Sequence, residues 1–139
     1  MKKFNDQYAL YADRKKDLEN NIEKILGALG LARNAGGLAI GNDAVAQAIS
    51  RGNARIVFIT KDISKNSLDK LLPKLIYTQT KHIFLPCDMT LLSDKLGKSG
   101  LVSVVALTRP GFEKIIFKCM DKASEINTLK PTDNKTEVQ

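Results

Sequence analysis

The sequence predicts an α/β protein, a three-layer α/β/α sandwich in which helices cover both faces of a central sheet of about four strands. Two observations predict this class. Along residues 20–122 the apolar residues switch repeatedly between helical spacing and short, β-branched runs. Glycines and helix-capping residues mark most of these switches. With 139 residues and 43% hydrophobic content, the chain has the size and composition of one globular domain.

The first half of this domain predicts a helix, a short strand, a second helix and a second strand. Apolar residues recur at helical spacing from Ile22, and Gly36-Gly37 ends that helix. A strand is expected at 38–40, and a helix at 42–51 with Asn42 or Asp43 as its N-cap. The apolar run at 54–60 is typical of a strand covered on both faces. The inward helical positions are Ile22, Ile25, Leu26, Leu29, Ala32, Val45, Ala48 and Ile49.

The second half predicts a third helix capped by Ser64, in which Pro73 should cause a kink or break near Leu72. A strand at 82–86 follows, and then a short helix that Asp88 caps and Gly97 ends. The last strand is expected at 101–107. Thr108 should cap a final helix with Pro110 near its first turn. The inward helical positions are Leu68, Leu71, Leu72, Leu75, Met89, Leu92, Leu96, Phe112, Ile115, Ile116, Cys119 and Met120.

Positive charge is concentrated in the predicted domain. Residues 20–122 carry fifteen Lys/Arg and eight Asp/Glu, which equals the whole net charge of +7. Residues 1–19 form an N-terminal extension of nearly balanced charge, and the polar segment 123–139 is expected to be a disordered tail. A basic folded domain favours an anionic partner such as nucleic acid. The alternative is a soluble protein that is merely basic.

The chain lacks the motifs of the common cofactor and metal sites. No glycine-rich dinucleotide or phosphate loop follows a strand, and His82 is the one histidine. Cys87 could be exposed at a strand end, while His82 is expected to be a structural or solvent-edge residue. We therefore expect no cofactor, no metal site, no catalytic residue and no enzymatic activity. Without a signal peptide or a membrane span, a cytoplasmic protein with reduced thiols is predicted.

From Ile25 to Ile116 the chain resembles the ribosomal protein L7Ae/L30e family of kink-turn RNA binders, most closely its small bacterial members. Three segments carry the resemblance: LGLARNAGGLAIGNDAVAQAISRGNARIVFITKD, LLSDKLGK and VVALTRPGFEKII. The resemblance implies a four-stranded mixed sheet between layers of helices. It also implies a ribosomal-protein-like function in recognising structured RNA, either ribosomal RNA or another kink-turn-like RNA, without a membrane or DNA as partner.

The resemblance places the RNA site at the start of the second helix and in two loops. These are 41–47, the loop 61–64 after the second strand, and the loop 98–101 before the last strand. A helix N-terminus offers free N–H groups and a positive dipole end to phosphate, and Gly41 permits close approach. Arg51, Lys65 and other basic residues would supply the surrounding positive field. The expected RNA-binding residues are Arg33, Gly41, Asn42, Asp43, Ala44, Gln47, Lys61, Lys98, Ser99, Gly100 and Leu101.

The chain departs from the strict kink-turn pattern at the start of the second helix. The strict binders have Asn-Glu followed by Lys where this chain has Asp43, Ala44 and Gln47. Gly37 replaces the basic residue that the family has before the first strand. The absent Glu and Lys motivate an alternative function, a protein-interaction module that keeps the fold but has lost kink-turn specificity. The substrate-recognising part of an RNA-modifying enzyme is a third hypothesis.

Overall fold

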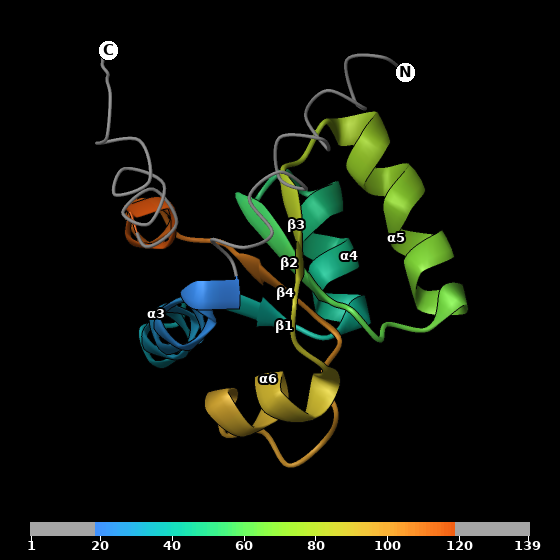
Figure 1. Cartoon of the computed structure of the whole chain (residues 1–139). Coiled ribbons are helices and arrows are strands. Elements are labelled where there is room, and N and C mark those ends of the chain that lie inside the picture. The colour runs from blue at the N-terminus through green and yellow to red at the C-terminus, as the bar shows by residue number, and fades with distance from the viewer. Residues whose placement is uncertain (1–18, 119–139) are drawn as a thin grey trace, which may run out of the picture.

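The computed structural model describes residues 19–118 (Figure 1). The sequence predictions for residues 1–18 and 119–139, including Cys119 and Met120 as inward positions, lie outside these residues. Among the helices of the described part, none is both long and apolar enough to cross a lipid bilayer.

A four-stranded mixed sheet forms the centre of the domain. Its strands are β1 (Leu38–Ile40), β2 (Ile56–Thr60), β3 (His82–Leu85) and β4 (Val104–Leu107), in the order β1-β4-β2-β3. Strand β4 is antiparallel to both of its neighbours, and β2 is parallel to β3. Strands β1, β2 and β3 therefore finish at the same end of the sheet, where β4 starts. We call this the carboxyl end, and the other the amino end.

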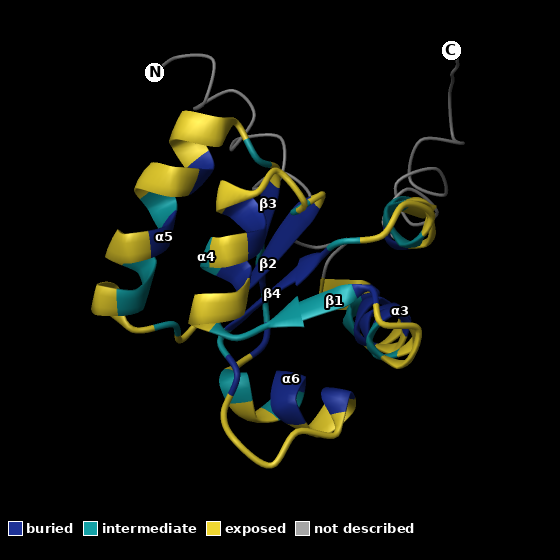
Figure 2. Cartoon of the chain, turned by 180° about the vertical axis from the view of Figure 1, so that it is seen from behind, coloured by how far each residue is buried: buried dark blue, intermediate teal, exposed yellow. Residues whose placement is uncertain are grey.

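Helices cover both faces of the sheet, which confirms the predicted three-layer class. Helices α3 (Ile22–Asn34) and α6 (Met89–Leu96) and the helical residues 112–118 lie on one face. Helices α4 (Asn42–Ser50) and α5 (Lys65–Thr78) lie on the other, as Figures 1 and 2 show. Both α4 and α5 connect the end of one strand to the start of the next, so both run from the carboxyl end to the amino end.

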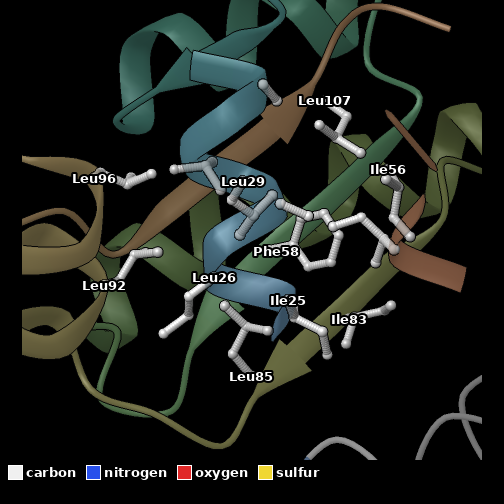
Figure 3. Close-up of a cluster of buried hydrophobic side chains, with 14 of the residues drawn as sticks. Ile25, Leu26, Leu29, Ile56, Phe58, Ile83, Leu85, Leu92, Leu96 and Leu107 are labelled. Atoms are coloured by element: carbon white, nitrogen blue, oxygen red, sulfur yellow. The ribbon is translucent and has the colours of Figure 1, made fainter. Parts of the chain in front are cut away.

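Two apolar layers fill the space between the sheet and its helices. All five residues of β2 are buried, as the continuous apolar run predicts. Ile56 and Phe58 face α3 and α6, while Val57 and Ile59 face α4 and α5. Figure 3 shows Phe58 among side chains from α3, α6 and the sheet. Each such fully buried side chain stabilises the fold by about 1.5–3 kcal/mol, which fixes the helices against the sheet.

Two strands start later than predicted because their first residues bond to helices. The N–H groups of Asn53 and Ala54 both donate to the carbonyl of Ala48 in α4, so β2 starts at residue 56 instead of 54. The N–H of Val102 donates to Ser93 Oγ in α6 at 2.8 Å. Strand β4 accordingly starts at residue 104 instead of 101, which lengthens the loop before it.

Of the expected kink or break near Leu72, the break is wrong, because α5 continues through Pro73. Pro73 cannot donate to the carbonyl of Asp69, four residues earlier. Both residues are exposed, so water can satisfy that carbonyl. Leu71 and Leu75 on either side are fully buried, and their packing keeps the helix intact.

The start of the final helix also differs from the prediction. The N–H of Thr108 donates to the carbonyl of Gly37 at 2.9 Å, and the helix begins only at Phe112, after Gly111. Thr108 as a cap is therefore wrong, while Pro110 lies in the turn just before the first turn of the helix. Ile116 is buried as expected, but Ile115 is 43% exposed, because adjacent helical residues point about 100° apart.

Candidate nucleic-acid interface

Three segments that are distant in the sequence meet at the carboxyl end of the sheet. The N–H of Gly41 donates to the carbonyl of Val104 at 3.0 Å, and the N–H of Thr60 donates to that of Ser103 at 2.9 Å. These bonds bring the start of α4, the β2–α5 loop and the end of the α6–β4 loop side by side (Figure 1). The first two contain the segments 41–47 and 61–64 that the sequence singled out, and the third leads on from the segment 98–101.

The start of α4 is open. Its N-cap is Gly41, with a φ of 96° and a ψ of 164°, and no side chain caps the helix. The expectation that Asn42 or Asp43 would be the cap is wrong. The Asn42 amide instead lies near α5 and donates to Ser67 Oγ at 3.3 Å. Asp43, Ala44 and Gln47 are exposed, so the first-turn N–H groups of α4 face solvent beside small or polar side chains.

The other two helices that begin here are capped, in contrast to α4. Ser64 Oγ accepts a bond from the N–H of Ser67, and Asp88 Oδ1 accepts one from the N–H of Leu91. Both caps agree with the sequence prediction. Of the three helices that start at the carboxyl end of the described domain, α4 alone therefore presents its first N–H groups without a side-chain partner.

The β2–α5 loop contributes one unpaired positive charge. Lys61 is exposed and forms no ion pair with a described residue. Asp62 Oδ1 accepts a bond from the N–H of Met89 at 3.0 Å, which ties this loop to the start of α6. Lys65 pairs with Asp69 at 2.9 Å, and the hydrogen bond to that carboxylate raises the pKa of Lys65. Lys65 therefore contributes less to the local field than expected.

The α6–β4 loop is exposed but anchored at both ends. Lys98, Ser99, Gly100 and Leu101 are exposed, and 68% of Leu101 is accessible. Arg33 Nη1 donates to the carbonyl of Leu96 at 2.6 Å, at the end of α6. The structure thus places Arg33 at the base of the loop, apart from the start of α4.

Charges at the carboxyl end nearly cancel, which the sequence alone did not reveal. Beside Lys61 and Lys98 lie the carboxylates of Asp43, Asp62 and Asp88. Arg51 does not belong to this end at all, because it is the C-cap of α4 at the amino end. Hydrogen bonding and close fit must therefore dominate over net charge in any recognition at this end.

A groove that sequence reasoning missed starts beside the open end of α4. It lies between α4 and α5 and has a volume of about 660 Å³. The i, i+4 spacing of Lys70 and Lys74 on a predicted helix could have indicated a basic line there. Its polar and small lining residues are Asn42, Asp43, Ala46, Ser67, Lys70 and Lys74.

Gly37 lies at the amino end of β1, in a tight contact. A Cβ on Gly37 would lie 3.1 Å from the Cβ of Arg109, so the Arg109 side chain covers this position. A basic side chain is thus present near the place where the resemblance implies one. It comes from the segment after β4.

Among residues 19–118, the histidine and the cysteine, which are the side chains suited to nucleophilic or acid–base chemistry near neutral pH, are both buried. His82 Nδ1 donates to the carbonyl of Thr80 at 3.1 Å, and burial lowers the pKa of His82. The expectation that Cys87 could be exposed is wrong, since 4% of it is accessible. Burial, together with Asp88 and Asp62, raises the pKa of Cys87 to about 11. Within residues 19–118, no three His, Cys, Asp or Glu residues cluster as metal ligands.

Residues 23–117 match the ribosomal protein L7Ae/L30e/S12e/Gadd45 family. The chain belongs to this family. Individual relatives support the same family membership. The chain is 31% identical to the RNA-binding protein YlxQ of Bacillus subtilis over 93 residues, which cover 67% of this chain and 91% of YlxQ. It is 40% identical to the large ribosomal subunit protein eL8 of Halobacterium salinarum over 53 residues, or 38% of this chain and 44% of eL8.

Solved structures of other proteins share the fold. A Bacillus halodurans protein of unknown function superposes with a TM-score of 0.62 at 26% identity, over 70% of this chain and 97% of that one. A Giardia lamblia 15.5 kD RNA-binding protein also gives a TM-score of 0.62, at 14% identity, over 77% and 90% of the two chains. The second similarity supports the fold alone.

Proposed function

We propose that this L7Ae/L30e-family chain is a cytoplasmic, non-enzymatic RNA-binding protein that recognises structured RNA at the carboxyl end of its sheet. The RNA is ribosomal RNA or another RNA that contains a kink-turn-like fold. The observation that carries the proposal is the open start of α4 between two exposed loops. The RNA-binding and ribosomal relatives support the same partner.

Recognition of bases uses the first two turns of α4. A kink-turn exposes the edges of sheared G·A pairs, which short polar side chains can reach. The carboxylate of Asp43 accepts hydrogen bonds from guanine amino groups, and Gln47, one turn later on the same side, donates or accepts. Gly41 and Ala44 have little or no side chain, so RNA can approach the free N–H groups of the helix.

Phosphate contacts come from the two loops. Lys61 and Lys98 are exposed lysines of these loops that form no ion pair with a described residue, and each would neutralise one phosphate. Ser99 and Gly100 add a hydroxyl and a backbone that RNA can approach closely. Leu101 offers an exposed apolar surface to a base or ribose. Arg33 acts indirectly, because it fixes the base of this loop through Leu96.

A role without catalysis is supported by the state of the reactive groups. At neutral pH, the raised pKa keeps the Cys87 thiol protonated and therefore a poor nucleophile. Burial favours neutral His82, whose ring lies inside the domain, away from solvent.

The experiment that tests the proposal compares two fluorescent RNAs. One contains a kink-turn, and the other has the same stems with the G·A pairs replaced by Watson–Crick pairs. We expect the kink-turn RNA to bind at least about ten-fold more tightly, since one good base contact provides that discrimination. Asp43→Ala should remove most of the difference. Binding to neither RNA at low salt would refute the proposal.

Paired lysine variants test the loop contacts. The double variant Lys61→Ala, Lys98→Ala should make the dependence of log affinity on log salt shallower by about 1.4–1.8, because two phosphate contacts are lost. The matched control is Lys24→Ala, Lys114→Ala, which removes two exposed lysines from α3 and from the helical residues 112–118, outside the three segments of the proposed site. If both double variants changed the salt dependence equally, only the net charge of the protein would matter for RNA binding.

A further inference from the structure

Positive charge is scarce at the carboxyl end of the sheet but concentrated at the amino end, around the C-terminal ends of α4 and α5. Residues 50–56 and 74–82 contain Arg51, Arg55, Lys74 and Lys81 and no acidic residue. The segments come together because both helices finish here, where β2 and β3 start. They surround a cavity of about 380 Å³ whose lining includes Ser50, Arg55, Thr78, Thr80 and Lys81. Arg55 and Lys81 line this cavity, Arg51 stands between its lining residues Ser50 and Gly52, and Lys74 bonds to Ser50. We call the cavity, together with these four basic residues in or beside it, the basic pocket.

Most of the charge in the basic pocket is free to meet an anion. Arg51 is exposed and forms no ion pair with any described residue. Lys81 lies with Nζ 5.6 Å from the centre of the Phe117 ring, a contact that orients the ammonium group without neutralising it. Arg55 pairs with Glu113 through Nε, which leaves the terminal nitrogens of the guanidinium able to donate. The hydroxyl groups of the lining suit phosphate oxygens.

The α4–α5 groove connects the basic pocket to the open start of α4. The groove begins at Asn42 and Ser67 and continues past Lys70 to Lys74. Lys74 Nζ in turn donates to Ser50 Oγ, at 3.4 Å, on the rim of the basic pocket. Lysines therefore follow the groove at one-turn spacing. Figure 2 shows α4 and α5 side by side with exposed residues along both helices.

An exposed aromatic ring lies at the far end of the same line. Tyr77 is 89% exposed. It follows Lys70 by seven residues and Lys74 by three, so all three lie on one side of α5. A ring beside lysines is the combination that single-stranded nucleic acid uses, since bases stack on the ring while the lysines contact phosphates.

We propose that RNA bound at the start of α4 continues along the α4–α5 groove, with its phosphates on Lys70 and Lys74, and ends with an unpaired base on Tyr77 and phosphates in the basic pocket. This inference rests on the proposed RNA-binding function and extends it to a second contact surface. The nine residues of α4 separate the two surfaces by about 14 Å, which a few nucleotides span. RNA with a single-stranded extension beyond its stem is therefore the favoured partner.

The test uses the full chain and two kink-turn RNAs, one trimmed to the motif and one with a single-stranded extension. Wild-type protein should bind the extended RNA at least about five-fold more tightly, as expected from one stacked base. Lys70→Ala, Lys74→Ala should abolish this advantage and make the salt dependence for the extended RNA shallower by about 1.4–1.8. It should leave binding of the trimmed RNA nearly unchanged. Lys24→Ala, Lys114→Ala is the charge-matched control.

A tyrosine series and a map of the contact complete the test. Tyr77→Phe keeps the ring and should bind the extended RNA like wild type, whereas Tyr77→Ser should lose the advantage. On addition of extended RNA, amide NMR signals of residues 50–55 and 77–81 should shift. The second contact surface would be refuted if wild type bound both RNAs with equal affinity, or if the groove double variant and the control double variant had equal effects. Either result would leave the proposed function intact. No binding of either RNA would overturn both.

Discussion

The backbone at Gly41 can be tested directly by the substitution Gly41→Ala. Gly41 combines a φ of 96° with a ψ of 164°, a region that residues with a Cβ essentially do not occupy. Its N–H bonds to Val104 and its carbonyl accepts from the N–H of Val45, so the surrounding structure fixes this conformation. A Cβ at Gly41 would meet no atom within 4 Å. The expected effect is therefore backbone strain alone, without a steric clash.

Because Gly41→Ala causes backbone strain without a clash, the loss of folding free energy equals the cost of that strain. A residue forced into such a region costs about 1–3 kcal/mol. For a domain of this size, each kcal/mol lowers the midpoint of thermal unfolding by about 4–8 °C. Gly27→Ala is the matched control, since Gly27 also has free space around its Cβ but lies inside α3 with ordinary helical φ. There alanine should stabilise by about 0.5–1 kcal/mol.

Urea and thermal unfolding of both variants, followed by circular dichroism, provide the measurement. We expect Gly41→Ala to unfold at least about 5 °C below wild type and Gly27→Ala to unfold at or above it. If Gly41→Ala were as stable as Gly27→Ala, the chain would not need a glycine at the start of α4, and the structural reason given for this open helix end would be wrong.

Three further predictions concern buried or anchoring groups. Arg33→Met should destabilise the domain by about 1–2 kcal/mol in urea unfolding and speed amide exchange in residues 97–103, because the bond to Leu96 is lost; unchanged exchange would show that Arg33 does not anchor the loop. Since burial lowers the pKa of His82, the unfolded state binds more protons below about pH 6.5, so stability should fall as pH decreases from 7 to 5. His82→Phe should flatten that slope, and an identical slope would exclude His82 as its cause. The pKa of Cys87 is raised to about 11, so the unfolded state loses its proton first and stability should fall between about pH 9 and 11; Cys87→Ala should remove this part of the loss, which parallel unfolding curves at pH 8 and 10.5 would measure.

Sequence patterns determine most of the fold because the relevant forces act locally. The helical spacing of Ile25, Leu26 and Leu29 and the continuous apolar run of β2 predict which faces are buried, and the structure confirms both. The caps at Ser64 and Asp88 are also correct, since a cap depends only on the next three residues.

Some local predictions fail where a distant element fixes the backbone differently. The N–H of Thr108 bonds to Gly37 next to β1, and the last helix begins four residues later, too far on for Thr108 to cap it. Asn42 is already the first residue of α4, with Gly41 as the N-cap, and its amide donates to Ser67 in α5. In the same way, the packing of Leu71 and Leu75 outweighs the local preference of Pro73 to interrupt α5. None of these partners can be inferred from the neighbouring residues in the sequence.

The sequence by itself determined the layered α/β class, most of the core positions and the family, and it proposed the three segments of the candidate interface. Only the tertiary structure decided how charge is divided between the two ends of the sheet, with Asp43, Asp62 and Asp88 offsetting the lysines at one end and Arg51, Arg55 and Lys81 gathered at the other. The physical reason is that burial and capping depend on residues a few positions apart. The electrostatic field of a surface depends instead on which chain segments the strand order β1-β4-β2-β3 places together.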